Sequence, residues 1–325
     1  MMKTENLKNK LRQIKLIHVV MLCAVVFVIF SILGTTLLAA GGLWDNNFNM
    51  IDGLFAVAQG NPVVMQDSSV ATTSDPQGNS IIVDDQVEQE LTGLTAVRIT
   101  TVSDDVILTH GGDKVRAHLK GVCRGMNVPV HLESALQGSQ WVVEVKYPKN
   151  SRSNWRGRSC STSLAITLPD DYPGDLAIAT VSGEIRARNL PVVMNEATLK
   201  TVSGDMDFNI AGYRKLSMGT VSGDLALWNV GAPTNVNTVS GDVDIHFEKV
   251  AQTHIKTVSG DVDVVVPTGE SFAVKFQSTS GEFESNYPGL PVRSVRRSFQ
   301  GSAGNGGVLV EISTTSGDCE LKVAR

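Results

Sequence analysis

A short string repeats along the C-terminal part of this 325-residue chain. It reads Thr-Val-Ser-Gly followed by an acidic and an apolar residue, and near-perfect copies begin at Thr180, Thr201, Thr220, Thr238 and Thr257. Degenerate copies occupy residues 278–283 and 314–319, and an early copy at 101–106 lacks the glycine. The serines lie 18 to 21 residues apart, except for a last interval of 36, twice 18. Self-similarity at a short fixed period is typical of stacked repeat architectures.

Each copy predicts two short strands that meet at a corner. The apolar positions alternate in one phase before the Ser-Gly pair, as at Leu199 and Thr201, and in the opposite phase after it, as at Met206 and Phe208. A glycine that supplies unusual backbone angles would explain the change of phase. We therefore predict an all-β fold, a parallel β-solenoid of about 18–21 residues per coil. Narrow coils also account for an aromatic content of only 6%.

A long apolar run precedes the repeats. Residues 19–43 carry no charge, and as a helix they would span roughly 37 Å, enough to cross a bilayer core of about 30 Å. Because basic residues stay in the cytoplasm, the basic tail over 1–16 predicts a cytoplasmic N-terminus and one transmembrane α-helix over 17–44. The alternative is a cleaved signal peptide, cut near Ala39–Gly41.

The rest of the chain is then expected outside the cytoplasm. Residues 45–90 show no sustained periodicity and predict a tether. Residues 91–325 predict the solenoid ectodomain, with irregular coils over 91–170 and regular repeats over 171–325. The expected location is the bacterial inner membrane, with a periplasmic or other extracytoplasmic C-terminal domain. A formal net charge of −5 argues against a nucleic-acid partner.

The anchor, the strand ending Ile166-Thr167-Leu168-Pro169 and the tandem Thr-Val-Ser-Gly-Asp-Val copies resemble a bacterial family of β-strand-repeat proteins, DUF4097, provisionally labelled adhesins. The resemblance covers about residues 91–325. It implies the solenoid fold and makes an adhesin-like or envelope-signalling role an expectation, but it supplies no catalytic residues. We expect a non-catalytic interaction module without a cofactor, which contacts the membrane through its helix and an envelope protein or glycan through its ectodomain.

An acidic residue follows each Ser-Gly corner. In the regular copies Asp205, Asp224, Asp242 and Asp261 recur at one position of the coil. Carboxylates are natural calcium ligands, so a calcium ladder is one hypothesis. Calcium-binding repeat turns use more glycines and backbone carbonyls than this motif offers, which favours a solvated turn whose Asp and Ser side chains bond local amides.

Aspartates also recur two positions apart, in pairs such as Asp242 and Asp244 or Asp261 and Asp263. Two such carboxylates on one strand face lie about 7 Å apart, within the range of about 6.5–9.5 Å found in inverting glycosidases. A polysaccharide-active β-helix enzyme that uses surface Asp pairs is therefore the alternative function. A pair that recurs in several coils is more typical of structure than of a unique active site, so we predict no enzyme.

Two features stand outside the repeat. Cys123 and Cys160 are candidates for a disulfide, because the exported part would meet an oxidising compartment. The segment 147–158 predicts a protruding loop, in which basic side chains surround a tryptophan and could bind an anionic glycan, a lipid headgroup or a partner. The alternative is a solvated loop. The candidate binding residues are Lys149, Arg152, Trp155, Arg156 and Arg158.

Overall fold

The computed structural model describes residues 66–67, 71–74, 80–125, 128–148 and 159–324. All of them belong to the second of two compact units, Met50–Arg325. Within these ranges the chain forms strands, turns and loops, and none of their segments is a helix that could cross a bilayer. The predicted transmembrane helix over 17–44 lies outside the described residues.

The described residues contain twenty-one strands. In chain order they are β1 (Gln66–Asp67), β2 (Ala71–Ser74), β3 (Ser80–Glu90), β4 (Ala96–Thr100), β5 (Asp105–His110), β6 (Lys114–Arg124), β7 (His131–Gln137), β8 (Gln140–Lys146), β9 (Ser159–Leu168), β10 (Asp175–Ala179), β11 (Ile185–Lys200), β12 (Met206–Gly219), β13 (Leu225–Val230), β14 (Thr234–Asn237), β15 (Val243–Phe247), β16 (Thr253–Lys256), β17 (Val262–Val266), β18 (Phe272–Ser285), β19 (Val292–Ala303), β20 (Val308–Ser313) and β21 (Cys319–Val323).

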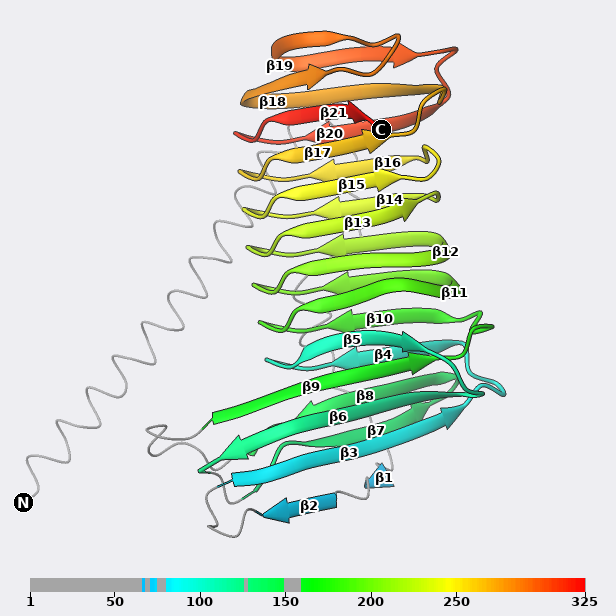
Figure 1. Cartoon of the computed structure of the whole chain (residues 1–325), viewed down its shortest axis with the longest axis vertical. Helices are drawn as coiled ribbons and strands as arrows, with labels where there is room; N and C mark the ends of the chain where they lie inside the picture. Colours follow the sequence, from blue (N-terminus) through cyan, green and yellow to red (C-terminus); the bar gives the residue numbers. More distant parts are fainter. Residues whose placement is uncertain (1–65, 68–70, 75–79, 126–127, 149–158, 325) are drawn as a thin grey trace, which may run out of the picture. The chain divides into compact units, whose positions relative to one another are not determined.

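The strands stack as coils, each of which contributes one strand to each of two columns (Figure 1). Parallel pairing runs through the first column from β8 to β4, β10, the C-terminal parts of β11 and β12, β14, β16, β20 and β18. In the second column it runs from β9 to β5, the N-terminal parts of β11 and β12, β13, β15, β17, β21 and the end of β18. The predicted all-β, solenoid-like architecture is confirmed.

Antiparallel strands close both ends of the stack, which the repeat did not predict. At one end β1 and β7 extend the first column, while β2, β3 and β6 extend the second. At the other end β19 pairs antiparallel with both halves of β18. Of the irregular coils predicted over residues 91–170, β4, β5, β8 and β9 pair in parallel, whereas β6 and β7 are antiparallel. An alternating apolar pattern reports which face is buried and carries no information on strand direction.

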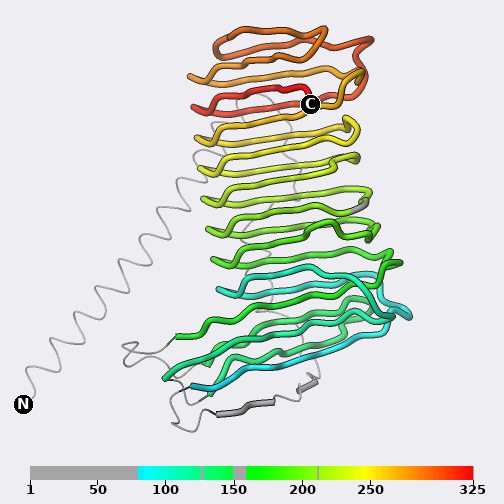
Figure 2. Tube along the Cα trace, in the orientation of Figure 1, coloured from blue at the N-terminus to red at the C-terminus, as the bar shows by residue number. Residues whose placement is uncertain are grey.

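The order of the coils in the stack differs from their order in the sequence. The final coil, formed by β20 and β21, lies between the β16–β17 coil and β18 (Figures 1 and 2). Likewise, the first coil, formed by β4 and β5, lies between the β8–β9 coil and the β10–β11 coil. The 36-residue interval is thus not a skipped coil, because the intervening chain leaves the parallel stack through β19 and then returns.

Strand β3 corrects the predicted boundary of the tether. Its eleven residues lie within 45–90 and pair along their whole length with β6. Val83, Asp85 and Val87 face the interior, whereas the residues between them are exposed. The many acidic and amide side chains of this strand concealed its period of two, and the aspartate at an interior position broke the apolar alternation on which the prediction depended.

One continuous core fills the space between the two columns. Its regular layers consist of aliphatic side chains, such as Leu199 and Leu216 in the first column and Ile185 and Leu225 in the second, all at most 1% exposed. Burial of each such side chain stabilises the fold by about 1.5–3 kcal/mol. Large aromatic rings gather at the end of the stack that β19 closes, where Phe283 stacks on Phe299 with ring centroids 4.6 Å apart. These wide rings lie between β18, the last strand that pairs in parallel with the stack, and the antiparallel β19 that closes it.

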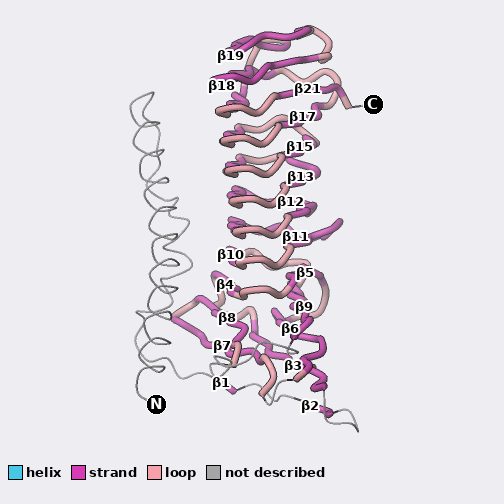
Figure 3. Tube along the Cα trace, turned by 90° about the vertical axis from the view of Figure 1, so that its left-hand side faces the viewer, coloured by secondary structure: helices cyan, strands magenta, loops and turns pink. Residues whose placement is uncertain are grey.

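The corner glycines are required by space rather than by backbone angle. The corner glycines of the repeats, such as Gly204 and Gly223, do not have positive φ, which corrects the expectation of unusual angles. A Cβ built on Gly223 would lie 1.9 Å from the carbonyl oxygen of Gly204 in the preceding coil. The corners therefore stack backbone on backbone, as the ladder of loops in Figure 3 shows.

Candidate interaction surfaces

The acidic residues of the corners form a line along one side of the stack, here called the acidic edge. In stacking order it consists of Glu184, Asp205, Asp224, Asp242, Asp261, Asp318 and Glu282. Each regular aspartate accepts a hydrogen bond from the amide of the acidic residue in the next coil. The Asp242 amide donates to Asp224 Oδ1 at 3.0 Å, and the Asp261 amide donates to Asp242 Oδ1 at 2.9 Å.

These bonds give the predicted ladder of Asp205, Asp224, Asp242 and Asp261 a role in holding coils together. Of the motif's other polar side chains, Ser222 also bonds to the neighbouring coil, because its Oγ donates to the carbonyl of Val202. Thr220 Oγ1 instead accepts from the Gly223 amide of its own corner and so fixes the shape of that corner. In the described ranges no group of three or more His, Cys, Asp or Glu is placed to hold a metal ion. The calcium ladder stays a prediction that these contacts do not require.

The second aspartate of each pair lies on the outward face of the second column. Asp207 accepts from Arg188 Nε at 2.7 Å, and Asp263 accepts from Lys322 Nζ at 3.0 Å. The two members of a pair therefore have different environments, one at a corner amide and the other beside a cation or on the open strand face. Neither the contacts nor the comparisons described below support the polysaccharide-active enzyme.

Cys123 and Cys160 are joined by a disulfide. They stand directly opposite each other in the antiparallel pair of β6 and β9, where two side chains on one face lie close enough for a bond. Cys319 is buried and free, and burial raises the pKa of its thiol. The loop residues Lys149, Arg152, Trp155, Arg156 and Arg158 lie outside the described residues.

Asp104 occupies the corner position where later copies have glycine. Its carboxylate is buried and accepts hydrogen bonds from the hydroxyls of Thr101, Tyr147 and Thr162. Burial, followed by the bond to Asp104, raises the pKa of the Tyr147 phenol. The β8–β9 coil, on which this coil stacks, supplies two of these partners, because Tyr147 follows β8 and Thr162 lies on β9.

An aromatic and acidic cluster lies on the outward face of the second column. We call it the Trp228 patch, and it consists of Trp228, Asp244, His246, Asp263 and Lys322, which lie on β13, β15, β17 and β21. The indole of Trp228 stacks on the imidazole of His246 with centroids 3.9 Å apart and planes inclined by 20°. Trp228 nevertheless remains 40% exposed.

The charges of the Trp228 patch are only partly paired. Lys322 Nζ lies 3.0 Å from carboxylate oxygens of both Asp263 and Glu320. In the described part of the chain Asp244 has no ion pair or hydrogen bond, and partial burial, followed by the nearby charge of Asp263, raises its pKa. Partial burial also lowers the pKa of His246, which favours the neutral ring.

Sequence reasoning missed this cluster. Neither Trp228 nor His246 was among the candidate site residues. The available signal was the repeat itself. Trp228 and His246 each stand four residues after the acidic corner residue of their own copy, and Asp244 and Asp263 each stand two residues after theirs. Side chains at equal repeat positions become neighbours when the coils stack.

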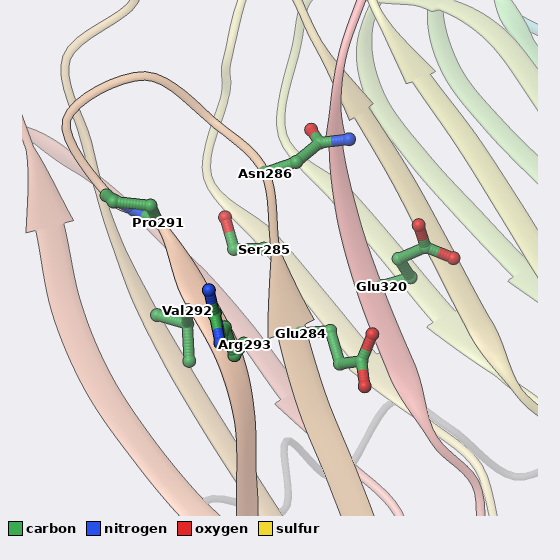
Figure 4. A pocket seen from close by; sticks show the side chains of 7 residues that line it. All are labelled: Glu284, Ser285, Asn286, Pro291, Val292, Arg293 and Glu320. Carbon is green, nitrogen blue, oxygen red and sulfur yellow. The ribbon is translucent and has the colours of Figure 1, made fainter.

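A pocket of about 450 Å³ lies near the end of the stack that β19 closes. Its walls come from the end of β18, the start of β19 and from β21, as Figure 4 shows. The side chains around it offer opposite charges, from Glu284, Glu320 and Arg293. It includes none of the residues that the sequence suggested as a site.

A family model described as Toastrack DUF4097 matches residues 95–230 and 174–322. No curated protein matches the sequence. Among solved structures, a provisionally named cell adhesion protein from Clostridium sporogenes is 12% identical, with a TM-score of 0.33 over 74% of this chain and 100% of that one. A provisionally named adhesin from Bacteroides fragilis is 14% identical, with a TM-score of 0.38 over 74% and 96%. A provisionally named lipid-binding protein from Parabacteroides distasonis is 12% identical, with a TM-score of 0.34 over 76% and 98%.

Proposed function

Because the chain belongs to the DUF4097 Toastrack family, we propose that it is a non-catalytic interaction module of the bacterial envelope, adhesin-like or accessory to envelope signalling. In this proposal the helix over 17–44 holds the chain in the inner membrane, and the β-solenoid lies on the extracytoplasmic side. Its partner is an envelope protein or a glycan.

One observation carries the proposal. The recurring serine and aspartate side chains bond to the neighbouring coil, and the recurring threonine bonds to the glycine amide of its own corner, so the motif builds a scaffold instead of a reaction centre. The scaffold exposes two broad strand faces to solvent, one on each column, and their outward side chains differ from coil to coil. Such faces provide contact area, and solenoid proteins use extended surfaces of this kind for binding.

The disulfide supports the extracytoplasmic location. A bond between Cys123 and Cys160 persists in oxidising compartments and is rare in the bacterial cytosol. The proposed topology places both cysteines beyond the inner membrane, where such a bond is stable.

Labelling with a membrane-impermeant maleimide tests the topology. In spheroplasts that express the full-length chain, K249C, on an exposed loop between β15 and β16, is expected to react without permeabilisation. The matched variant N9C, in the basic tail, is expected to react only after permeabilisation. The unmodified chain reports background from its native cysteines. Protection of K249C, or free reaction of N9C, would overturn the proposed topology.

Retention by envelope fractions tests the interaction role. The full-length protein in detergent is immobilised and exposed to separated membrane-protein and glycan fractions of the same cells. Specific retention of at least one fraction is expected, because an interaction module has a resident partner. If neither fraction is retained above an unloaded matrix, the interaction role is wrong.

A further inference from the structure

Trp228 is unusual because most other large aromatic rings of the described residues lie in the core. It is the one aromatic residue among the exposed large hydrophobic side chains of the described ranges. The stack on His246 covers one face of the indole, and the 40% exposure leaves another part of the side chain open to solvent. A fixed, solvent-exposed indole is a ready contact for a ligand, because it loses little conformational freedom on binding.

The surroundings of the indole are flat and acidic. Ala226 precedes Trp228 by two residues on the same outward face, and the strand register places it between Asp207 and Asp244. The small methyl group therefore forms a floor, bordered by the indole along the strand and by carboxylates across it. Of these carboxylates, Asp207 is paired with Arg188, whereas Asp244 makes no hydrogen bond or ion pair among the described residues.

This combination selects a particular ligand chemistry. The apolar C–H face of a pyranose ring packs well on an indole, and sugar hydroxyl or amino groups bond to carboxylates. An ammonium group gains further, because it neutralises Asp244 and interacts with the indole π-system. Neighbouring strands lie about 4.8 Å apart, close to the rise of one residue in an extended β-linked polysaccharide, so successive sugars along the stack would meet successive strands.

We propose that the Trp228 patch binds a β-linked amino-sugar polymer, with one pyranose ring stacked on Trp228 and its amino group bound by Asp244. This assignment rests on the proposed function, which requires an envelope protein or a glycan as partner, and it identifies the glycan and its site. The neutral imidazole of His246 supports the indole, and Lys322 holds Asp263 so that Asp244 remains the available anion.

Calorimetric titration of the full-length protein with three hexasaccharides tests the proposal. The probes are the β-1,4-linked hexamers of glucosamine, of N-acetylglucosamine and of glucose. We expect the glucosamine hexamer to bind most tightly. W228A should weaken all binding roughly five- to thirtyfold, and W228F should restore part of it, because an aromatic contact is worth about 1–2 kcal/mol at a partly desolvated site. D244N should abolish the preference for the free amine.

The matched control is V193A, which removes an exposed side chain (59%) from β11, away from the patch. It should leave all three affinities unchanged, and unchanged melting temperatures show that the variants are folded. Three results would overturn the assignment: no hexamer binds, W228A binds like the wild type, or a lysine-rich peptide binds more tightly than any hexamer. Equal affinity for all three hexamers would overturn the role of Asp244. If envelope retention persists while no hexamer binds, only the ligand assignment fails and the proposed function stands.

Discussion

Substitution of one corner glycine measures how tightly the coils stack. In G223A the new methyl group would lie 1.9 Å from the carbonyl oxygen and 2.5 Å from the carbonyl carbon of Gly204. Ordinary van der Waals contact begins at 3.4 Å, and the opposing atoms are backbone, so no side-chain rotation can relieve the overlap. The two corners must move apart by more than an ångström.

The expected loss follows from the bonds that cross this corner. Val202 accepts from the amides of Val221 at 3.2 Å and Ser222 at 3.0 Å, and Asp205 accepts from the amide of Asp224 at 2.9 Å. Each contributes about 0.5–1.5 kcal/mol net, so breaking all three should destabilise the stack by about 1.5–4.5 kcal/mol. The lower unfolded-state entropy of alanine returns about 0.4–1 kcal/mol.

Gly231 provides the matched control. A Cβ at this position meets nothing within 4 Å, and its φ is not in the left-handed region, so G231A should change stability by less than about 1 kcal/mol. Urea denaturation followed by circular dichroism, with hydrogen exchange of the corner peptides, compares the two variants. Because a stack of repeats can open locally, exchange at the corner separates local from global loss. Equal midpoints and equal exchange in G223A and G231A would refute the close-stacking argument.

Three further perturbations test other contacts. D242A should lose about 1 kcal/mol because the next corner amide loses its acceptor, whereas D242N retains an oxygen and should lose less; equal losses would contradict the ladder. Reduction of the Cys123–Cys160 bond, which closes 37 residues, should cost roughly 3–4 kcal/mol in the chain-entropy model, and a melting curve unchanged by reductant would contradict it. The hydrogen bond from Lys275 lowers the pKa of Glu311 below 4.5, so its stabilisation is present above that pH and is lost as pH falls through the folded-state pKa. E311Q should flatten this part of the pH–stability curve, and an unchanged curve would contradict the assignment.

The local part of the fold was readable from the sequence, and the long-range part was not. The change of phase between Leu199 and Met206 correctly predicted two strands and a corner, because side-chain alternation depends only on neighbouring residues. The directions of β6 and β19 depend on which strands they meet. Near-identical copies of one motif likewise cannot specify their stacking order, since any copy offers the next the same corner.

The site was predictable to the same extent. Alignment of the repeats places Trp228 next to His246. It does not show that Lys322 pairs with Asp263 and leaves Asp244 without an ion pair, because Lys322 reaches the patch on β21 of the inserted final coil. The glycine argument from φ was wrong for a related reason. The contact that excludes a side chain at Gly223 comes from another coil, 19 residues earlier in the sequence.

The first and the last coil of the sequence both lie inside the stack, and this position determines how such a chain can lengthen during evolution. Since the first and the last coil each lie inside the stack, with antiparallel strands beyond them, a copy added at either terminus of the solenoid would have no place next to its own kind. Duplication between β12 and β17 instead leaves both closures intact and only displaces them by one coil. Relatives of different length are thus expected to differ by whole internal copies, and a chain that stops before β20 would lack an interior layer of its stack.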